Sequence, residues 1–173
     1  IRINGRDIGE DEFARHAYRV RETAEKLLAA GDLEYRPTFF EQITAIALVA
    51  FAEAGSELAI LETGLGGRLD ATTAADAELA AFTRIDLDHQ EYLGDTIQEI
   101  AAEKAAIIHE GTRAVVVGSQ SEDVRKVIEG ECRKYRIELF DAHSSAIRVA
   151  RLGLAGKHQI ENAQIAACVA KQL

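Results

Sequence analysis

The chain has 173 residues, which is enough for one domain with a hydrophobic core. Its 47% hydrophobic and 28% charged residues are ordinary for a soluble globular protein. The net charge of -9 argues against a nucleic-acid partner, because such a partner requires a clustered basic face. The longest apolar stretch, residues 45–52, is far too short to span a membrane.

Cysteine and methionine usage adds two expectations. Cys132 and Cys168 are distant in the sequence and form no CxxC pair, so we expect reduced thiols in a cytoplasmic protein. The chain contains no methionine and begins at Ile1, which favours a piece of a longer protein over simple loss of an initiator.

Hydrophobic periodicity and capping signals predict the elements in chain order. In the first half they are a strand end and turn at residues 1–5, a helix capped by Asp11 and ending near Ala30, a helix over 39–53 with a capping box of Thr38 and Glu41, and strands over 57–62 and 79–85. In the second half they are a helix from Thr96 to about His109, a strand over 114–118, a helix from Ser121 to about Tyr135, a strand near 137–140, a strand and turn within 147–154, and a helix over 159–173. This alternation predicts one α/β domain over residues 1–173, with a mostly parallel sheet flanked by helices.

Two of the predicted strands end in polar residues that could carry chemistry. The first ends at Glu62 and opens into a loop with Gly64, Gly66 and Gly67, and the second leads to His89. Ligands bind at the carboxyl edge of parallel strands, so we expect both side chains at one edge of the sheet. A carboxylate beside a glycine loop suits Mg²⁺ near phosphates, whereas a strand-terminal glutamate beside a flexible turn is the structural alternative.

His89 follows Asp86 and Asp88, so it could bind a metal with a carboxylate as its orienting partner. From the residues alone, an exposed loop histidine beside the acids of the next helix is the simpler explanation.

Lys104 falls inside the apolar stripe of its helix, between Ile100 and Ile108. Burial of an ammonium lowers its pKa, by up to ~3–5 units in fully buried groups. The side chain should therefore extend its charge to water, which is the simpler outcome, or react as a neutral amine with CO₂ to form a carbamate.

Four more polar residues are candidates for binding. Arg68, close to Asp70, could bind phosphate or a substrate carboxylate, or form a surface ion pair. His158 and Asn162 are four residues apart on the last helix and share a face. Asn162 could hydrogen-bond an adenine edge, or only groups in its own helix.

The sequence contains no G-x-x-x-x-G-K-[ST] motif, and no lysine follows the glycines at 64–67. The chain therefore has no P-loop of its own.

Five segments, in order, resemble the folylpolyglutamate synthase/dihydrofolate synthase family of ATP-dependent Mur-type ligases. They are residues 38–41, 61–72, 87–94, 100–105 and 156–163, of which the ETGLGGRLDAT run at 62–72 is the most specific. The resemblance implies the central ATPase-type domain, without the P-loop strand and helix, which lie upstream in the family. The family's C-terminal domain lies downstream. Thr73 and Ala106 replace a common asparagine and a common glycine, and both changes look tolerable.

The resemblance also implies roles for individual residues. Glu62 and His89 match magnesium ligands, and Lys104 matches a carbamylated lysine, so His89 and Lys104 are the catalytic candidates. Five residues match positions that line the pteroate site, and Arg68 accompanies them as the candidate for a substrate carboxylate; the five are Thr38, Phe40, Leu69, Asp70 and Ala71. Asn162 matches an ATP contact, and His158 shares its face.

The implied reaction uses ATP and Mg²⁺ to phosphorylate a folate or dihydropteroate carboxylate, and glutamate then displaces phosphate to form an amide. Without a P-loop, the isolated chain is expected to be inactive. Two rivals remain open: another Mur-type ligase acting on a peptidoglycan precursor, and a non-catalytic folate-binding or interaction module.

Overall fold

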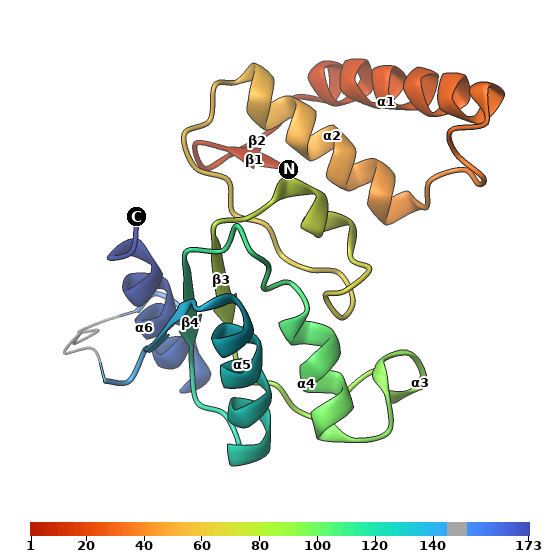
Figure 1. Ribbon diagram of the computed structural model, residues 1–173. Coiled ribbons are helices and arrows are strands. Elements are labelled where there is room, and N and C mark those ends of the chain that lie inside the picture. The colour runs from red at the N-terminus through yellow and green to blue at the C-terminus, as the bar shows by residue number, and fades with distance from the viewer. Residues whose placement is uncertain (145–151) are drawn as a thin grey trace. The chain divides into compact units, whose positions relative to one another are not determined.

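A computed structural model describes residues 1–144 and 152–173 of the chain, and these form two compact units (Figure 1). The N-terminal unit comprises Ile1–Gly64 and Asp70–Ala75, and the sheet unit comprises Leu65–Leu69 and Asp76–Leu173. The glycine-rich segment contributes residues to both units.

The N-terminal unit contains a short hairpin, two α-helices and a 3₁₀ helix. Its elements are β1 (Arg2–Ile3), β2 (Arg6–Asp7), α1 (Glu10–Ala30), α2 (Phe39–Glu53) and η1 (Ala71–Ala75). The predicted turn is confirmed: β1 and β2 pair antiparallel, and Asn4 and Gly5 both have positive φ, as a two-residue hairpin turn of this kind requires. Neither β2 nor η1 was predicted.

The two long helices of this unit begin differently. The predicted capping box of α2 is confirmed, since the Thr38 hydroxyl accepts from the Glu41 N–H and the Glu41 carboxylate accepts from the Thr38 N–H. The predicted Asp11 cap of α1 is wrong. The N-cap is Gly9, and no side chain caps the helix. Asp11 lies within the first turn, where its negative charge interacts favourably with the positive end of the helix dipole.

The predicted strand over residues 57–62 is wrong, because these residues form no strand. A strand is stable only when its backbone hydrogen-bonds to a neighbour, and no described residue of the chain pairs with this segment. Leu58 and Ile60 are accordingly 54% and 86% exposed. Glu62 therefore does not follow a strand of the sheet, as the sequence had led us to expect.

The sheet unit is a three-stranded parallel sheet between helices, which confirms the predicted α/β fold. Its elements are β3 (Leu79–Phe82), α3 (Gln90–Leu93), α4 (Ile97–Ala105), β4 (Ala114–Val117), α5 (Glu122–Tyr135), β5 (Glu138–Asp141) and α6 (His158–Ala170). The strand order is β3-β4-β5, and Ala114 of β4 is in register with Leu79 and with Glu138.

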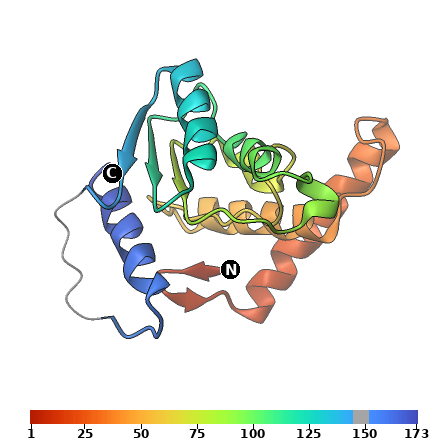
Figure 2. The ribbon, with the colours of Figure 1, turned by 90° about the horizontal axis from the view of Figure 1, so that it is seen from below.

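Side chains of β4 alternate between the two faces of this sheet. Val115 and Val117 belong to a large core that also includes Ile100 and Ala101 of α4 and Ile128 of α5. On the other face, Val116 packs with Ala142 and with Ile165 and Cys168 of α6. Figure 2 shows α6 on one side of the strands and α4 and α5 on the other. All four residues of β4 are buried, as the run of valines predicts.

Several boundaries in the sheet unit differ from prediction. The helix predicted from Thr96 to His109 ends at Ala105, because the chain turns there through i→i−3 hydrogen bonds to the carbonyls of Lys104 and Ala105. The strand predicted over 79–85 ends at Phe82. The helices capped by Thr96 and Ser121 begin as predicted. Of the strand and turn predicted within 147–154, residues 147–151 lie outside the described residues, and 152–154 form no strand.

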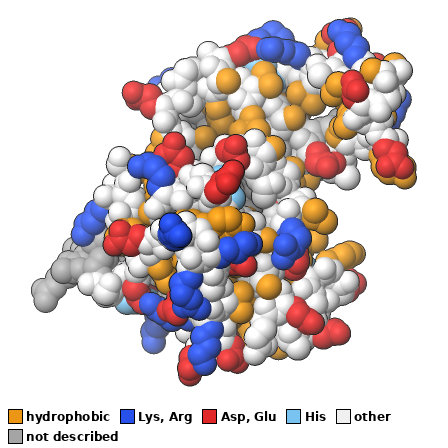
Figure 3. Space-filling model, in the orientation of Figure 1, with side chains coloured by type: hydrophobic (Ala, Val, Ile, Leu, Met, Phe, Trp, Pro, Cys, Tyr) orange, Lys and Arg blue, Asp and Glu red, His pale blue; other side chains and the backbone are white. Residues whose placement is uncertain are grey.

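On the face shown in Figure 3, acidic and basic side chains are interspersed over α5. Pairs one helical turn apart, such as Lys126 with Glu122 and Arg125 with Glu129, account for much of this pattern. None of the helices formed by residues 1–144 and 152–173 combines the length and hydropathy that a membrane crossing needs.

Candidate functional site

The Asp70 carboxylate organises the glycine loop within the N-terminal unit. One of its oxygens accepts the Gly64 N–H at 2.7 Å, and the other accepts the Thr72 N–H at 2.9 Å and the Thr72 hydroxyl. The side chain is buried. Asp70 therefore ties the first part of the loop to η1, which begins at Ala71, and its hydrogen bonds explain why an acid follows the glycines at this spacing.

The second part of the loop packs on the end of α4, within the sheet unit. A Cβ on Gly67 would lie 2.7 Å from the carbonyl oxygens of Glu103 and Lys104, so only glycine fits here. Arg68 donates its backbone N–H to the Glu103 carbonyl at 3.1 Å, which satisfies one of the helix's terminal acceptors. The loop thus caps α4 at the turn that carries Lys104.

The Arg68 guanidinium pairs with the Glu103 carboxylate, with Nε 2.9 Å from Oε1. This side-chain hydrogen bond and the nearby charge raise the pKa of Arg68. The arginine therefore forms the ion pair that the sequence left open as an alternative, although with Glu103, which the sequence reasoning had not singled out. Because the pair is half exposed, a competing anion could still displace Glu103.

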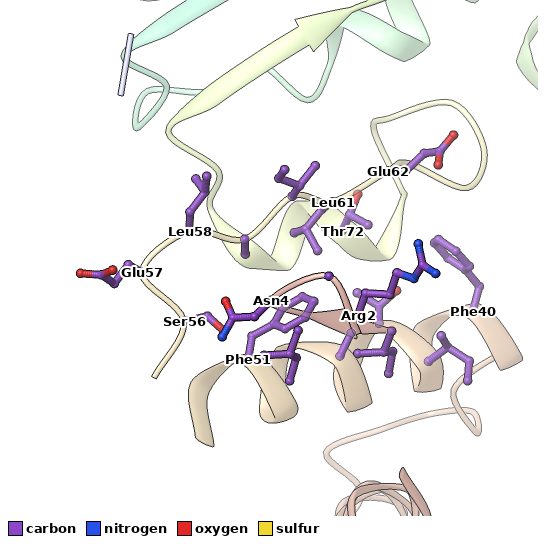
Figure 4. Close-up of a pocket in the computed structure, with 18 residues that line it drawn as sticks. Arg2, Asn4, Phe40, Phe51, Ser56, Glu57, Leu58, Leu61, Glu62 and Thr72 are labelled. Atoms are coloured by element: carbon purple, nitrogen blue, oxygen red, sulfur yellow. The ribbon is translucent and has the colours of Figure 1, made fainter. Parts of the chain in front are cut away.

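Glu62 lies beside an apolar groove of the N-terminal unit, and its carboxylate points away from α2 (Figure 4). The groove has a volume of about 660 Å³. It is lined by four parts of this unit: the hairpin, the α2 face with Ile43, Ala47 and Phe51, residues 56–62, and Thr72 of η1. Among the described residues, no group hydrogen-bonds to or pairs with the Glu62 carboxylate, so its lone pairs are available to a ligand.

His89 is held in an uncommon backbone conformation, with φ 52° and ψ 37°, directly before α3. Such left-handed geometry is disfavoured for residues other than glycine, and where it persists it often marks a functional position. Asp88 accepts the His89 N–H at 2.8 Å, and its other oxygen lies 3.5 Å from His89 Nε2. The imidazole is half exposed, with this carboxylate beside it as the sequence suggested.

Lys104 lies in the apolar stripe of α4, as predicted, and it is partly buried rather than enclosed. Ile100 and Ala101, one turn before it on α4, are fully buried, and Ile108, beyond the end of the helix, is buried as well. The ammonium forms no hydrogen bond or ion pair within residues 1–144 and 152–173, which leaves it available for a ligand or for modification.

The remaining predicted substrate contacts lie in different settings. The Thr38 hydroxyl is engaged in the α2 capping box, where it donates to Glu41 at 2.7 Å. The Phe40 ring lies against Gly64, where a Cβ would approach it to 2.8 Å, and it lines the groove. Leu69 is 93% exposed.

His158 and Asn162 both lie exposed on the first turns of α6. Gln159 connects them, since it hydrogen-bonds to His158 Nε2 at 3.1 Å and accepts from Asn162 Nδ2 at 3.3 Å. Glu161, directly before Asn162, is a contact that the sequence did not predict. Its carboxylate accepts the Ser119 N–H at the end of β4, and this bond, with further hydrogen bonds from the Ser119 and His143 side chains, lowers the pKa of Glu161.

Glu62 and His89 each carry a side chain of a type that binds divalent cations. Mg²⁺ needs only one or two protein ligands because it retains waters. Glu62 has free lone pairs, and His89 has a carboxylate beside its ring. The described residues contain no group of three or more His, Cys, Asp or Glu side chains arranged to hold a metal, so a site of the all-protein kind is not formed among them.

Comparison with known proteins identifies the family. The profile of the Mur ligase middle domain matches residues 11–128. The chain belongs to the Mur ligase middle-domain family. Within it, the chain is part of the folylpolyglutamate synthase/dihydrofolate synthase family, as the sequence motifs implied.

Three relatives show the extent of the similarity. The dihydrofolate synthase/folylpolyglutamate synthase of Bacillus subtilis is 37% identical over 149 residues, which cover 85% of this chain and 34% of the relative. The Mycobacterium tuberculosis folylpolyglutamate synthase solved with ADP and AMPPCP aligns at a TM-score of 0.87 and 29% identity, covering 98% of this chain and 44% of that one. A solved FPGS–AMPPCP–folate complex aligns with a TM-score of 0.81 and 27% sequence identity. The alignment covers 91% of this chain and 43% of that one. The chain thus spans less than half the length of these relatives.

Proposed function

We propose that the chain is the middle-domain portion of an ATP-dependent ligase that joins L-glutamate to a folate or dihydropteroate carboxylate. The observation that carries the proposal is the glycine loop: the run at 62–72 folds into a loop that Asp70 ties to η1 and that caps the helix of Lys104. Similar chains have been solved with ADP, with AMPPCP and with folate, which supports nucleotide and folate binding here.

In this proposal the nucleotide phosphates lie near the glycine loop. ATP transfers its terminal phosphoryl group to the substrate carboxylate, giving an acyl phosphate and ADP. The glutamate amine then attacks the acyl carbon, forms the amide and releases phosphate. When bound by Glu62 and His89, Mg²⁺ supplies charge neutralisation of the phosphoryl oxygens.

The chain's own residues contribute orientation and charge. Phe40 and Leu69 offer apolar surface for a pteridine or benzoyl ring, and Arg68, released from Glu103, offers a cation for a carboxylate. Lys104, as a neutral amine, adds CO₂ and loses a proton to give a carbamate, which places a negative group at the end of α4.

The segment that carries the P-loop belongs, in this proposal, to another part of a longer protein. The groove beside residues 56–62 supports this idea, because an extended apolar segment with exposed Leu58 and Ile60 is suited to a neighbouring strand. The 173-residue chain alone is then expected to lack ligase activity.

The test measures ligation in the complete protein with ATP, glutamate and either dihydropteroate or tetrahydrofolate. Glu62→Ala and His89→Ala should each weaken magnesium-dependent turnover by about 100-fold, whereas Glu110→Ala, an exposed control, should not. Normal turnover and unchanged magnesium dependence in both variants would refute the metal assignment. Turnover with a UDP-linked precursor but not with folates would favour the peptidoglycan-type ligase instead.

A further inference from the structure

The first turns of α6 pack directly on the backbone at the end of β4. A Cβ on Gly118 would lie 2.7 Å from Ile165 Cδ1 and 2.9 Å from Glu161 Oε1, so a side chain at position 118 would push the helix away. Ile165 and Cys168 of α6 are buried beside Val116 and close the apolar side of this contact.

A single carboxylate completes the polar side of the contact. Glu161 Oε1 accepts the Ser119 N–H at 2.5 Å and lies 3.4 Å from His143 Nε2. A hydrogen bond of 2.7 Å links His143 Nε2 to Ser119 Oγ. Glu161 thereby joins α6 to the segments that follow β4 and β5. About three quarters of the Glu161 side chain is buried.

The same contact determines where the exposed face of α6 lies. Ser119 and His143 follow parallel strands, so Glu161 fixes the start of α6 at the carboxyl edge of the sheet, where ligands bind in α/β folds. Glu161 is adjacent to Asn162 and three residues after His158. A helix is rigid over one turn, so the Glu161 contact sets both the rotation of the helix and the position of those two side chains.

We propose that Glu161 is a positioning residue for nucleotide binding: through Ser119 and His143 it orients α6 so that Asn162 and His158 face the nucleotide. This inference rests on the proposed function, because it requires these two residues to contact ATP. Glu161 itself does not contact the nucleotide.

The experiment measures KM for ATP and kcat separately in the complete protein. E161A should raise the KM for ATP by about tenfold while changing kcat less than about twofold, since the residue orients a binding face and not the reacting atoms. E161Q keeps an oxygen for the Ser119 N–H and should recover most of the affinity. E161D keeps the charge but is one methylene shorter, and it should not. Glu110→Ala is the matched control.

Amide hydrogen exchange provides a second readout, independent of activity. The Ser119 N–H should exchange about tenfold faster in E161A and E161D than in the wild type or E161Q, while Val115 at the centre of β4 stays protected. Should E161A fail to fold, the comparison of E161Q with E161D still decides the question.

The outcomes separate the inference from the proposed function. If Asn162→Ala raises the KM for ATP but E161A and E161D do not, the positioning role is refuted and the nucleotide role of Asn162 stands. If Asn162→Ala has no effect either, the nucleotide role of this helix fails and the inference fails with it. A parallel loss of kcat and thermal stability without a change in KM would assign Glu161 a purely structural role.

Discussion

Two apolar segments of similar length behave in opposite ways in this chain. Ala114–Val117 forms β4, pairs with a strand on each side and buries all four residues. Residues 58–61, Leu-Ala-Ile-Leu, form no strand and leave Ile60 86% exposed. Their side chains are equally hydrophobic, so hydrophobicity does not explain the difference. Within the part of the chain that the structure describes, β4 has strands with which its backbone hydrogen-bonds, and residues 58–61 have none.

A strand forms only where a neighbouring strand can pair with it. Each buried N–H and C=O needs a partner, and the local sequence supplies none of them. The helices differ in this respect, since their hydrogen bonds close within the segment. α2 and α5 accordingly begin at the residues that their capping signals predict.

The largest expected effect is the difference in stability between an isoleucine-to-alanine substitution in the packed core and the same substitution in residues 58–61. Ile100→Ala, at a fully buried position beside the sheet, should lower the free energy of unfolding by about 2–5 kcal/mol. Ile60→Ala should change it by less than about 0.5 kcal/mol in the 173-residue chain. Urea unfolding followed by circular dichroism measures both. Equal losses would show that residues 58–61 are packed after all.

Two glycine-to-alanine substitutions compare the stability effect of an added methyl group in a packed position and in an open one. Gly67→Ala should lower the free energy of unfolding by about 1–3 kcal/mol, because the added methyl group meets the carbonyls at the end of α4. Gly153→Ala meets nothing within 4 Å and should leave stability unchanged or slightly higher. A neutral Gly67→Ala variant would contradict the close approach of the loop to α4.

The capping boxes test whether the two units are stabilised separately. Thr38→Ala and Thr96→Ala should each cost about 1 kcal/mol, since each removes one side-chain acceptor at a helix start. Residue-resolved amide exchange should show faster exchange in α2 for the first variant and in α4 for the second. Faster exchange throughout β4 in Thr38→Ala would show that the units unfold together.

The smallest expected effect is a difference in acid sensitivity. Hydrogen bonds from the Thr38 side chain and backbone lower the pKa of Glu41, and those from the Thr96 backbone and side chain lower the pKa of Glu99. A lowered pKa in the folded state stabilises the fold above the unfolded value near 4.5, and this contribution is lost as pH falls through the folded pKa. Glu41→Gln and Glu99→Gln should therefore be less stable than the wild type at pH 6, and the difference should shrink towards pH 3. A constant difference in thermal melts would contradict these shifts.

Much of the fold could be predicted because its signals are local. The valine run of β4, the Thr96 and Ser121 caps and the Asn4-Gly5 turn each depend on a few neighbouring residues. The strand at 57–62 and the length of α4 could not, because they depend on a pairing partner and on the backbone that meets the helix end. The same holds for the candidate site. The sequence motifs identified Glu62, Asp70, His89 and Lys104 as candidates, but they did not predict the contacts of these residues.

The sequence by itself determined the family, the alternation of strands and helices, and the residue types available for chemistry, since these are properties of composition, spacing and motif. Only the tertiary structure decided that Asp70 uses both its oxygens to organise the glycine loop, that Arg68 pairs with Glu103, and that Glu161 joins α6 to the end of β4. Those contacts join residues 6, 35 and 42 positions apart. A hydrogen bond depends on distance and angle in space, and for such pairs the folded backbone sets both.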